Sequence, residues 1–309
     1  MSIKKDILST LAYFDIFDYP LKKREIALFI PNSYNDPEFE TAMDELLTSS
    51  GIYKMDQFYS LQNNYSIIQR RNKGNNKAMK VMVTAEKVAS FLSKFPFVQG
   101  VAISGSLSKD YADDVSDIDL FLITSKNRLW IARSLLHVVY KIACLFKKQH
   151  LFCMNYYIDE EQLEIEEKNI YTATEIVTLI PLQGSVVFEE FFSANSWTKK
   201  FLPNNYMRIS TAKTIRRIWP RRLVEWMLNN RMGNYIDNYL LRITSKRWEK
   251  KTHRKLINKN GLPFGMKTSK HFAKHDPNIF QTKILSLHES KLSALLTQHK
   301  VRPINISQR

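Results

Sequence analysis

Hydrophobic positions recur at helical spacing near the start of the chain and then alternate like strands. Helical spacing over residues 3–17, 21–30 and 36–47, followed by alternation over 51–61, predicts three helices and a β-hairpin. This order of elements is typical of a winged-helix-like domain, which we expect to span residues 1–62. The third helix is rich in acidic residues and would be repelled by phosphates. The pattern therefore favours a scaffold or protein-contact role over DNA binding.

A central unit is predicted over residues 63–160. A long helix over 63–95, with a polar interruption at 73–76, leads into an apolar strand over 98–103. Further elements are predicted as a strand over 117–123, a helix over 127–146 and a strand over 150–158. Three strands with helices between and before them predict a mixed sheet covered by helices, and thus an α+β fold.

The remainder, residues 161–309, is predicted to be a basic and mainly helical domain. A helix opens at Asn169 and ends near Pro181, and helical spacing resumes from Arg208 and again over 278–298. Residues 1–198 hold 21 Lys/Arg and 25 Asp/Glu, whereas residues 199–309 hold 25 and 5, a net +20. A block this basic attracts polyanions such as nucleic acid. A helical domain with a solvated cationic face explains the same charges equally well.

The candidate functional residues are concentrated in residues 97–124, FVQGVAISGSLSKDYADDVSDIDLFLIT. Asp117 and Asp119 alternate with Ile118 and Leu120, so we expect both carboxylates on one face of a strand, about 7 Å apart. Two neighbouring carboxylates repel each other unless a cation lies between them. Mg²⁺, held by one or two carboxylates plus substrate phosphates, suits such a pair.

The tight turn before these aspartates predicts a phosphate-binding site. Gly105 permits a sharp turn and a close approach of the backbone to a ligand. The backbone N–H groups of the turn and the Ser106 hydroxyl are suited to phosphate oxygens, and Lys109 adds a positive charge. Together with Asp117 and Asp119, these residues predict a site for a nucleoside triphosphate and Mg²⁺.

An apolar strand, Gly-Ser, a gap of ten residues and an Asp-Ile-Asp flanked by apolar residues resemble a known signature. It is that of the nucleotidyltransferase superfamily of the DNA polymerase β type, whose smaller members include the minimal and aminoglycoside nucleotidyltransferases. The motif covers residues 98–124, and a looser match extends to about residue 158. The resemblance implies a nucleotidyltransferase-like mixed sheet and transfer of a nucleoside monophosphate.

The family usually supplies a third metal-binding carboxylate from the strand predicted here over 150–158. Asn155 and Asp159 are the candidates, and a two-residue period would place them on one face. Asn155 is neutral, so it binds a cation more weakly than a carboxylate and cannot act as a base. Glu175, within an apolar helix, is similar to the general base that aminoglycoside nucleotidyltransferases use on the acceptor hydroxyl. A glutamate solvated on a helix surface explains the same pattern.

The sequence thus predicts a Mg²⁺-dependent nucleotidyltransferase that moves a nucleoside monophosphate from a triphosphate to a hydroxyl acceptor. The alternative is a non-catalytic protein on the same fold that binds a nucleotide or nucleic acid. No run of 18 apolar residues occurs in the sequence, so we expect no insertion into a membrane. The two cysteines, Cys144 and Cys153, predict reduced thiols in a cytoplasmic protein.

Overall fold

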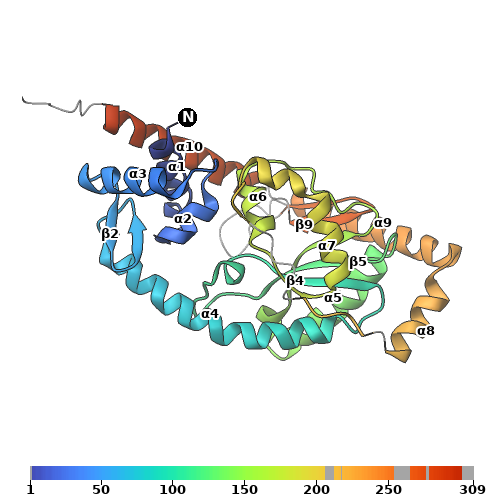
Figure 1. The fold of residues 1–309 in the computed structure, drawn as a ribbon. Helices are drawn as coiled ribbons and strands as arrows, with labels where there is room; N and C mark the ends of the chain where they lie inside the picture. Colours follow the sequence, from blue (N-terminus) through green and yellow to red (C-terminus); the bar gives the residue numbers. More distant parts are fainter. Residues whose placement is uncertain (1, 206–211, 217, 254–264, 276–277, 301–309) are drawn as a thin grey trace, which may run out of the picture.

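The fold is described from a computed structural model, for residues 2–205, 212–216, 218–253, 265–275 and 278–300. Its centre is a six-stranded mixed sheet in the order β7-β4-β5-β6-β9-β8, and a small antiparallel sheet in the order β1-β3-β2 lies nearer the N-terminus (Figure 1). The expected α+β class is confirmed. The strands expected over 98–103, 117–123 and 150–158 correspond to β4, β5 and β6, but β5 begins two residues and β6 three residues later than expected.

The N-terminal part contains the predicted three helices and hairpin. Its elements are α1 (Ile3–Asp15), β1 (Leu21–Lys22), α2 (Lys23–Phe29), α3 (Asp36–Thr48), β2 (Tyr53–Met55) and β3 (Phe58–Ser60). Apolar faces of the helices meet in one core that contains Ile7, Leu11, Ile26 and Met43. The short strand β1 pairs with β3, so the hairpin is extended to three strands.

Helix α4 (Tyr65–Leu92) connects this part to the central sheet as one continuous helix (Figure 1). The predicted interruption at residues 73–76 is wrong. The ring of Tyr111 lies so close to Gly74 that a Cβ there would be 2.3 Å from the ring. Glycine is unfavourable in a helix interior, but here it allows the loop after β4 to pack directly on the helix. Arg71 is buried and donates to Pro20 O and to Glu25, which fixes α4 to the N-terminal part.

The central sheet has helices on both faces. The strands are β4 (Val98–Ile103), β5 (Asp119–Thr124), β6 (Cys153–Asp159), β7 (Ile180–Gln183), β8 (Met266–Thr268) and β9 (Phe272–His275). Leu120 and Leu122 of β5 pack with α4, α5 (Leu129–Leu145) and α9 (Arg231–His253). Phe121 and Ile123 pack on the other face, with α6 (Ile170–Val177) and α7 (Ser185–Ala194). This alternation sets the face on which every polar residue of β5 lies.

The C-terminal part does not form a mainly helical unit of its own, which corrects the expectation for residues 161–309. Three of its segments, β7, β8 and β9, are strands of the central sheet. Helix α8 (Trp219–Leu228) packs with α9, and α10 (Asn278–Lys300) returns to pack on α1 (Figure 1). There Lys291 is ion-paired with Asp15, and the His288 ring lies 3.2 Å from the Ser9 hydroxyl.

Candidate functional site

The candidate site lies where β4 ends and the neighbouring strand β5 begins. The two strands are antiparallel, with Ile103 opposite Leu120, so the turn after β4 lies beside the first residue of β5. The backbone N–H of Ser104 donates to Asp119 O at 3.0 Å. The sheet register therefore brings the Gly-Ser turn and the aspartates together, as the sequence predicted.

Gly105 packs directly against Asp119. Its φ is +66°, and a Cβ at this position would lie 2.2 Å from Asp119 Oδ2. Most L-residues avoid this left-handed conformation, and no side chain fits the space. The backbone of the turn is thus packed directly against the carboxylate. Ser106, half-buried, follows at the start of a short 3₁₀ turn over Leu107–Lys109.

Asp117 lies just before β5 and not within it, because the strand begins at Asp119, two residues later than predicted. It is exposed, Ile118 is buried in the core below α4, and Asp119 is half-buried. The two aspartates therefore flank a buried residue, as expected of extended backbone. Repulsion from Asp117 contributes to a raised pKa of Asp119, which indicates that the two carboxylates lie near each other.

Asn155 reaches Asp119 because β6 contains a β-bulge. Met154 pairs with Leu120 and Tyr156 pairs with Phe121, so Asn155 is the extra residue. A bulge changes the direction of the side chain at that position. The Asn155 amide nitrogen donates to Asp119 Oδ1, and the Cys153 thiol donates to Asn155 Oδ1 at 3.2 Å. Of the two candidates for the third position, Asn155 is the one that contacts Asp119.

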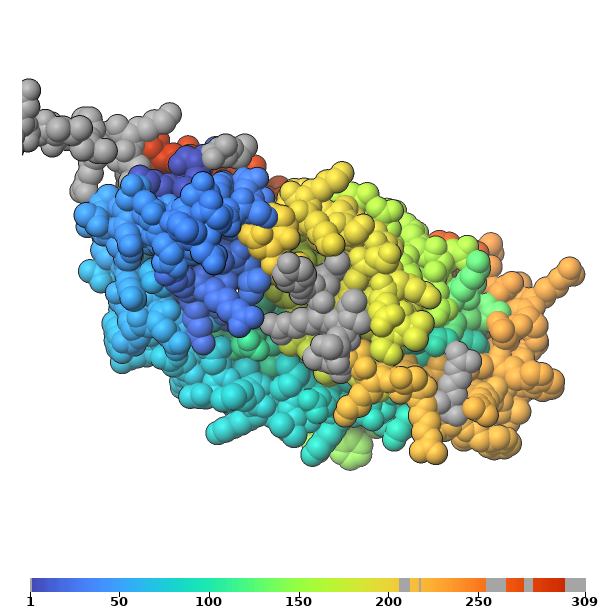
Figure 2. Space-filling model, in the orientation of Figure 1, coloured from blue at the N-terminus to red at the C-terminus, as the bar shows by residue number. Residues whose placement is uncertain are grey.

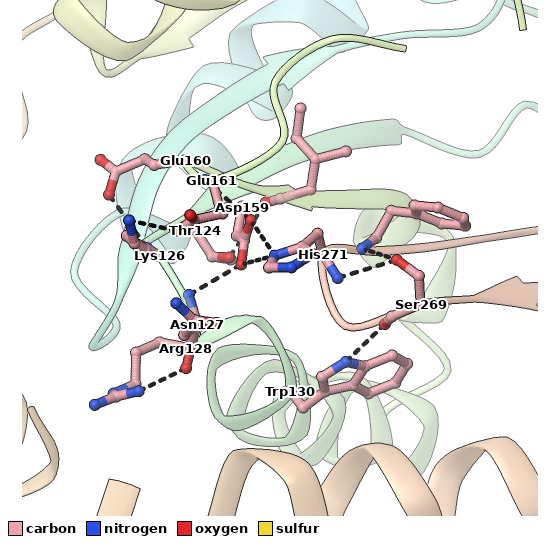
Figure 3. A network of polar contacts seen from close by, with 12 residues as sticks. Thr124, Lys126, Asn127, Arg128, Trp130, Asp159, Glu160, Glu161, Ser269 and His271 are labelled. Atoms are coloured by element: carbon pink, nitrogen blue, oxygen red, sulfur yellow. Dashed lines mark hydrogen bonds and ion pairs between the residues drawn. The ribbon is translucent and has the colours of Figure 1, made fainter. Parts of the chain in front are cut away.

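Asp159 does not belong to this site. It pairs with Thr124 at the far end of β5, about 17 Å along the strand from Asp119 at 3.4 Å per residue. The bulge at Asn155 also places Asp159 on the opposite face of the sheet, which corrects the expectation that the two share a face. Its carboxylate is fully buried and accepts hydrogen bonds from the backbone N–H groups of Asn127 and Glu161. His271 Nδ1 lies 3.1 Å from both oxygens (Figure 3).

Lys109 and Glu175 bring a cation and a further acid to the site. Lys109 Nζ is 2.9 Å from a Glu175 carboxylate oxygen and donates to Gly105 O at 3.2 Å. Glu175 comes from α6, the helix on the same face of the sheet as Asp119. Both side chains are partly exposed. The structure therefore brings together Gly105, Ser106, Lys109, Asp117, Asp119, Asn155 and Glu175.

Two tyrosines near the site were not predicted. Tyr19, from the N-terminal part, donates its hydroxyl to Lys109 O at 2.5 Å and so supports the turn from outside. Tyr171 of α6 is half-buried, and its pKa is raised first by burial and then by the charges of Glu175 and Asp119. Their contribution depends on contacts between distant segments, for which the sequence gives no local signal.

The pKa of Asp119 is raised to about 6, mainly by burial and also by the charges of Asp117 and Glu175, against hydrogen bonds from Cys153 and Asn155 that lower it. Burial and the charges of Asp119 and Asp117 raise the pKa of Cys153 to about 12, so its thiol remains protonated and able to donate a hydrogen bond. A carboxylate held in such acidic surroundings gains from a nearby cation.

The donor set suits a cation that takes further ligands from a substrate. Among the described residues, no three His, Cys, Asp or Glu side chains are arranged as a metal site. The carboxylates of Asp117 and Asp119 remain, since Asn155 turns its amide nitrogen, which does not bind metals, toward Asp119. Two carboxylates fit Mg²⁺ bound by one or two carboxylates plus substrate phosphates. They do not fit a metal held by protein ligands alone.

No family model, curated protein or solved structure matches this chain. The chemistry of the site therefore has to be inferred from its own geometry.

The stability of the fold is expected to depend on pH through Asp119. Its folded pKa of about 6 lies above the value of about 4 expected in the unfolded chain. The folded state then binds more protons between these values, so stability falls as pH rises from about 4 to about 6. Unfolding of the wild type and of Asp119→Asn should be compared over this range. The wild type should lose stability relative to the variant, and parallel curves would contradict the raised pKa. Asp237, whose pKa burial also raises to about 6, is common to both proteins and cancels.

Proposed function

We propose that this chain is a Mg²⁺-dependent nucleotidyltransferase that transfers a nucleoside monophosphate from a nucleoside triphosphate to a hydroxyl acceptor. The nucleotidyltransferase-like fold is part of the proposal. The observation that carries it is the contact between Gly105 and Asp119, where a Cβ would be 2.2 Å from the carboxylate. The backbone of the turn, which would bind phosphate, thus lies beside the Asp119 carboxylate, which would bind Mg²⁺. A metal–triphosphate complex requires both groups close together.

Five residues of the site have a role in binding the metal and the triphosphate in this proposal. Asp117 and Asp119 would hold Mg²⁺, which when bound neutralises charge on the triphosphate. The Gly105–Ser106 turn and Lys109 would bind phosphate oxygens and orient the triphosphate, so that the acceptor oxygen attacks the α-phosphorus and pyrophosphate leaves.

Glu175 is the proposed general base for the acceptor hydroxyl. In the free protein its carboxylate lies 2.9 Å from the Lys109 ammonium. Phosphate oxygens that attract the Lys109 ammonium would release the Glu175 carboxylate. A base freed in this way by the first substrate is suited to accept a proton from the second.

Titration calorimetry with Mg²⁺ and ATP, GTP or CTP tests the binding step. Asp117→Asn should weaken binding by about tenfold or more, because one of the two carboxylate ligands is lost. Asp114→Asn is the matched control, since Asp114 is an exposed carboxylate of the same loop that pairs with Lys77. Equal affinity in the wild type and Asp117→Asn would contradict the proposed site.

A second candidate function is nucleotide binding without transfer. It is favoured by Asn155, which donates to Asp119 at the position from which a third carboxylate is expected. Pyrophosphate release in the presence of small-molecule alcohols, hydroxyl-bearing proteins or RNA ends separates the two functions. Release that Asp119→Asn abolishes supports the transferase, and binding without release by any acceptor supports the second function.

A further inference from the structure

Helix α8 is amphipathic in the opposite sense from an ordinary surface helix, which buries its apolar face. It buries a charged residue instead: Arg221 is 1% exposed, pairs with Glu225 at 2.7 Å and donates to Ser93 O at 2.7 Å. Its large apolar residues face outward, with Trp219 and Trp226 73% and 78% exposed.

Helix α9 packs against α8 and also exposes large apolar residues in its first turns. Residues 219, 223 and 226 are spaced to share one helix face, and so are 232, 235 and 239. We call this set the aromatic ridge, and its members are Trp219, Leu223, Trp226, Met227, Met232, Tyr235 and Tyr239. The ridge lies at the end of the molecule remote from α1, α3 and α10 (Figure 1), and Figure 2 shows the orange segments forming this end of the surface. A contiguous exposed apolar surface on a folded protein usually marks an interaction site.

The surroundings of the ridge are cationic. Residues 212–248 contain nine Lys/Arg and two Asp/Glu, a net charge of 9 − 2 = +7. Both acids are occupied: Glu225 binds Arg221 and the Phe97 N–H, and Asp237 is buried and accepts from the Ile131 N–H. Arg222 and Arg231 are exposed on the same two helices. The partner of the ridge is therefore expected to be anionic.

We propose that the aromatic ridge binds the surface of an anionic lipid bilayer. Indole and phenol rings favour the interface between headgroups and acyl chains, and arginines pair with lipid phosphates. Leucine and methionine side chains gain from the acyl boundary, whereas stacked nucleic-acid bases offer them little. A second copy of the chain would bring two cationic surfaces together, and like charges repel. Among the described residues no helix could cross a bilayer, so the chain would lie on the surface.

Changes in tryptophan fluorescence report on the ridge, because the exposed tryptophans that a membrane could reach belong to it. The chain has five tryptophans. Trp130, Trp197 and Trp248 are buried, whereas Trp219 and Trp226 are exposed. The full-length chain should be mixed with vesicles of phosphatidylcholine alone or with about one-third phosphatidylglycerol. We expect co-flotation with the anionic vesicles, a blue shift of the emission, and quenching when brominated acyl chains are used.

Two double variants distinguish binding through the ridge from non-specific hydrophobic binding by other exposed residues. Trp219→Ser combined with Trp226→Ser should lower the partition coefficient at least about tenfold, because most of the exposed indole surface is lost. Met79→Ser combined with Val83→Ser is the matched control, since these exposed apolar residues lie one turn apart on α4. The control should bind like the wild type.

Several results would overturn the proposal. Equal binding to neutral and anionic vesicles would show that the positive charge has no role in binding. Binding that persists after the double tryptophan substitution would show that the ridge is not the binding surface. If single-stranded RNA shifts the emission of Trp219 and Trp226 while vesicles do not, the ridge binds nucleic acid instead. A dimer that the double substitution abolishes, without vesicle binding, would assign the ridge to self-association.

Discussion

Gly105→Ala is expected to abolish measurable binding of Mg²⁺–nucleotide and to destabilise the fold. The new Cβ would overlap Asp119 Oδ2 at 2.2 Å, and the backbone at φ +66° is unfavourable for alanine. Strain of this kind costs about 1–3 kcal/mol before any clash is relieved. The carboxylate and the turn would have to separate, so the site that joins them would be lost. Calorimetry and thermal unfolding measure both effects.

Two further variants test whether the effect of Gly105→Ala comes from the clash with Asp119 or from a general disturbance of the loop. Val115→Ala is the control, because Val115 is the most exposed apolar residue between the turn and the aspartates. Asp119→Ala removes the atoms that the new Cβ would meet first. The stability loss of the Gly105→Ala/Asp119→Ala double variant should therefore be smaller than the sum of the two single losses. Additive losses would mean that the close contact is not the reason for the glycine.

Asp159→Ala is expected to lower the free energy of unfolding by about 3 kcal/mol or more. The carboxylate is 0% exposed and joins the start of α5 to the β8–β9 turn, through the Asn127 N–H and His271 (Figure 3). Removing it leaves partly buried donors without their acceptor, and the nearby Trp130 indole donates a hydrogen bond to Ser269 O. Denaturant unfolding gives the magnitude.

The same residue tests where the third metal ligand could lie. Asp159→Asn keeps the shape of the side chain, so the fold should persist with reduced stability. Its affinity for Mg²⁺–nucleotide should stay within about twofold of the wild type, since Asp159 lies at the other end of β6 from Asp119. A large loss of nucleotide affinity without a loss of stability would mean that Asp159 takes part in nucleotide or metal binding after all.

The elements that sequence predicted well are those with strong local patterns. The run Val98–Ile103 and the alternation after Asp117 are apolar patterns that few other structures produce. The Gly-Ser turn and the aspartates were placed correctly because antiparallel pairing of two consecutive strands brings their connected ends together.

The errors arose where distant contacts decide the structure. Strand β7 has four residues and contains Pro181, which is tolerated because β7 is at the edge of the sheet. Strands β8 and β9 are short and partly polar, and β9 pairs with β6 from more than 100 residues away. The bulge at Asn155 shifts the two-residue period, so counting along β6 put Asp159 on the wrong face. The ring of Tyr111 explains Gly74 within a continuous helix.

The position of a bound cation tests the central claim most directly. Crystals of the chain grown with Mn²⁺ and a non-hydrolysable triphosphate would locate the metal by its anomalous scattering. We predict a peak within about 2.2 Å of a carboxylate oxygen from each of Asp117 and Asp119, with triphosphate oxygens beside the Gly105–Ser106 turn. A triphosphate bound away from this turn, or a metal peak that contacts neither aspartate, would contradict the proposed site.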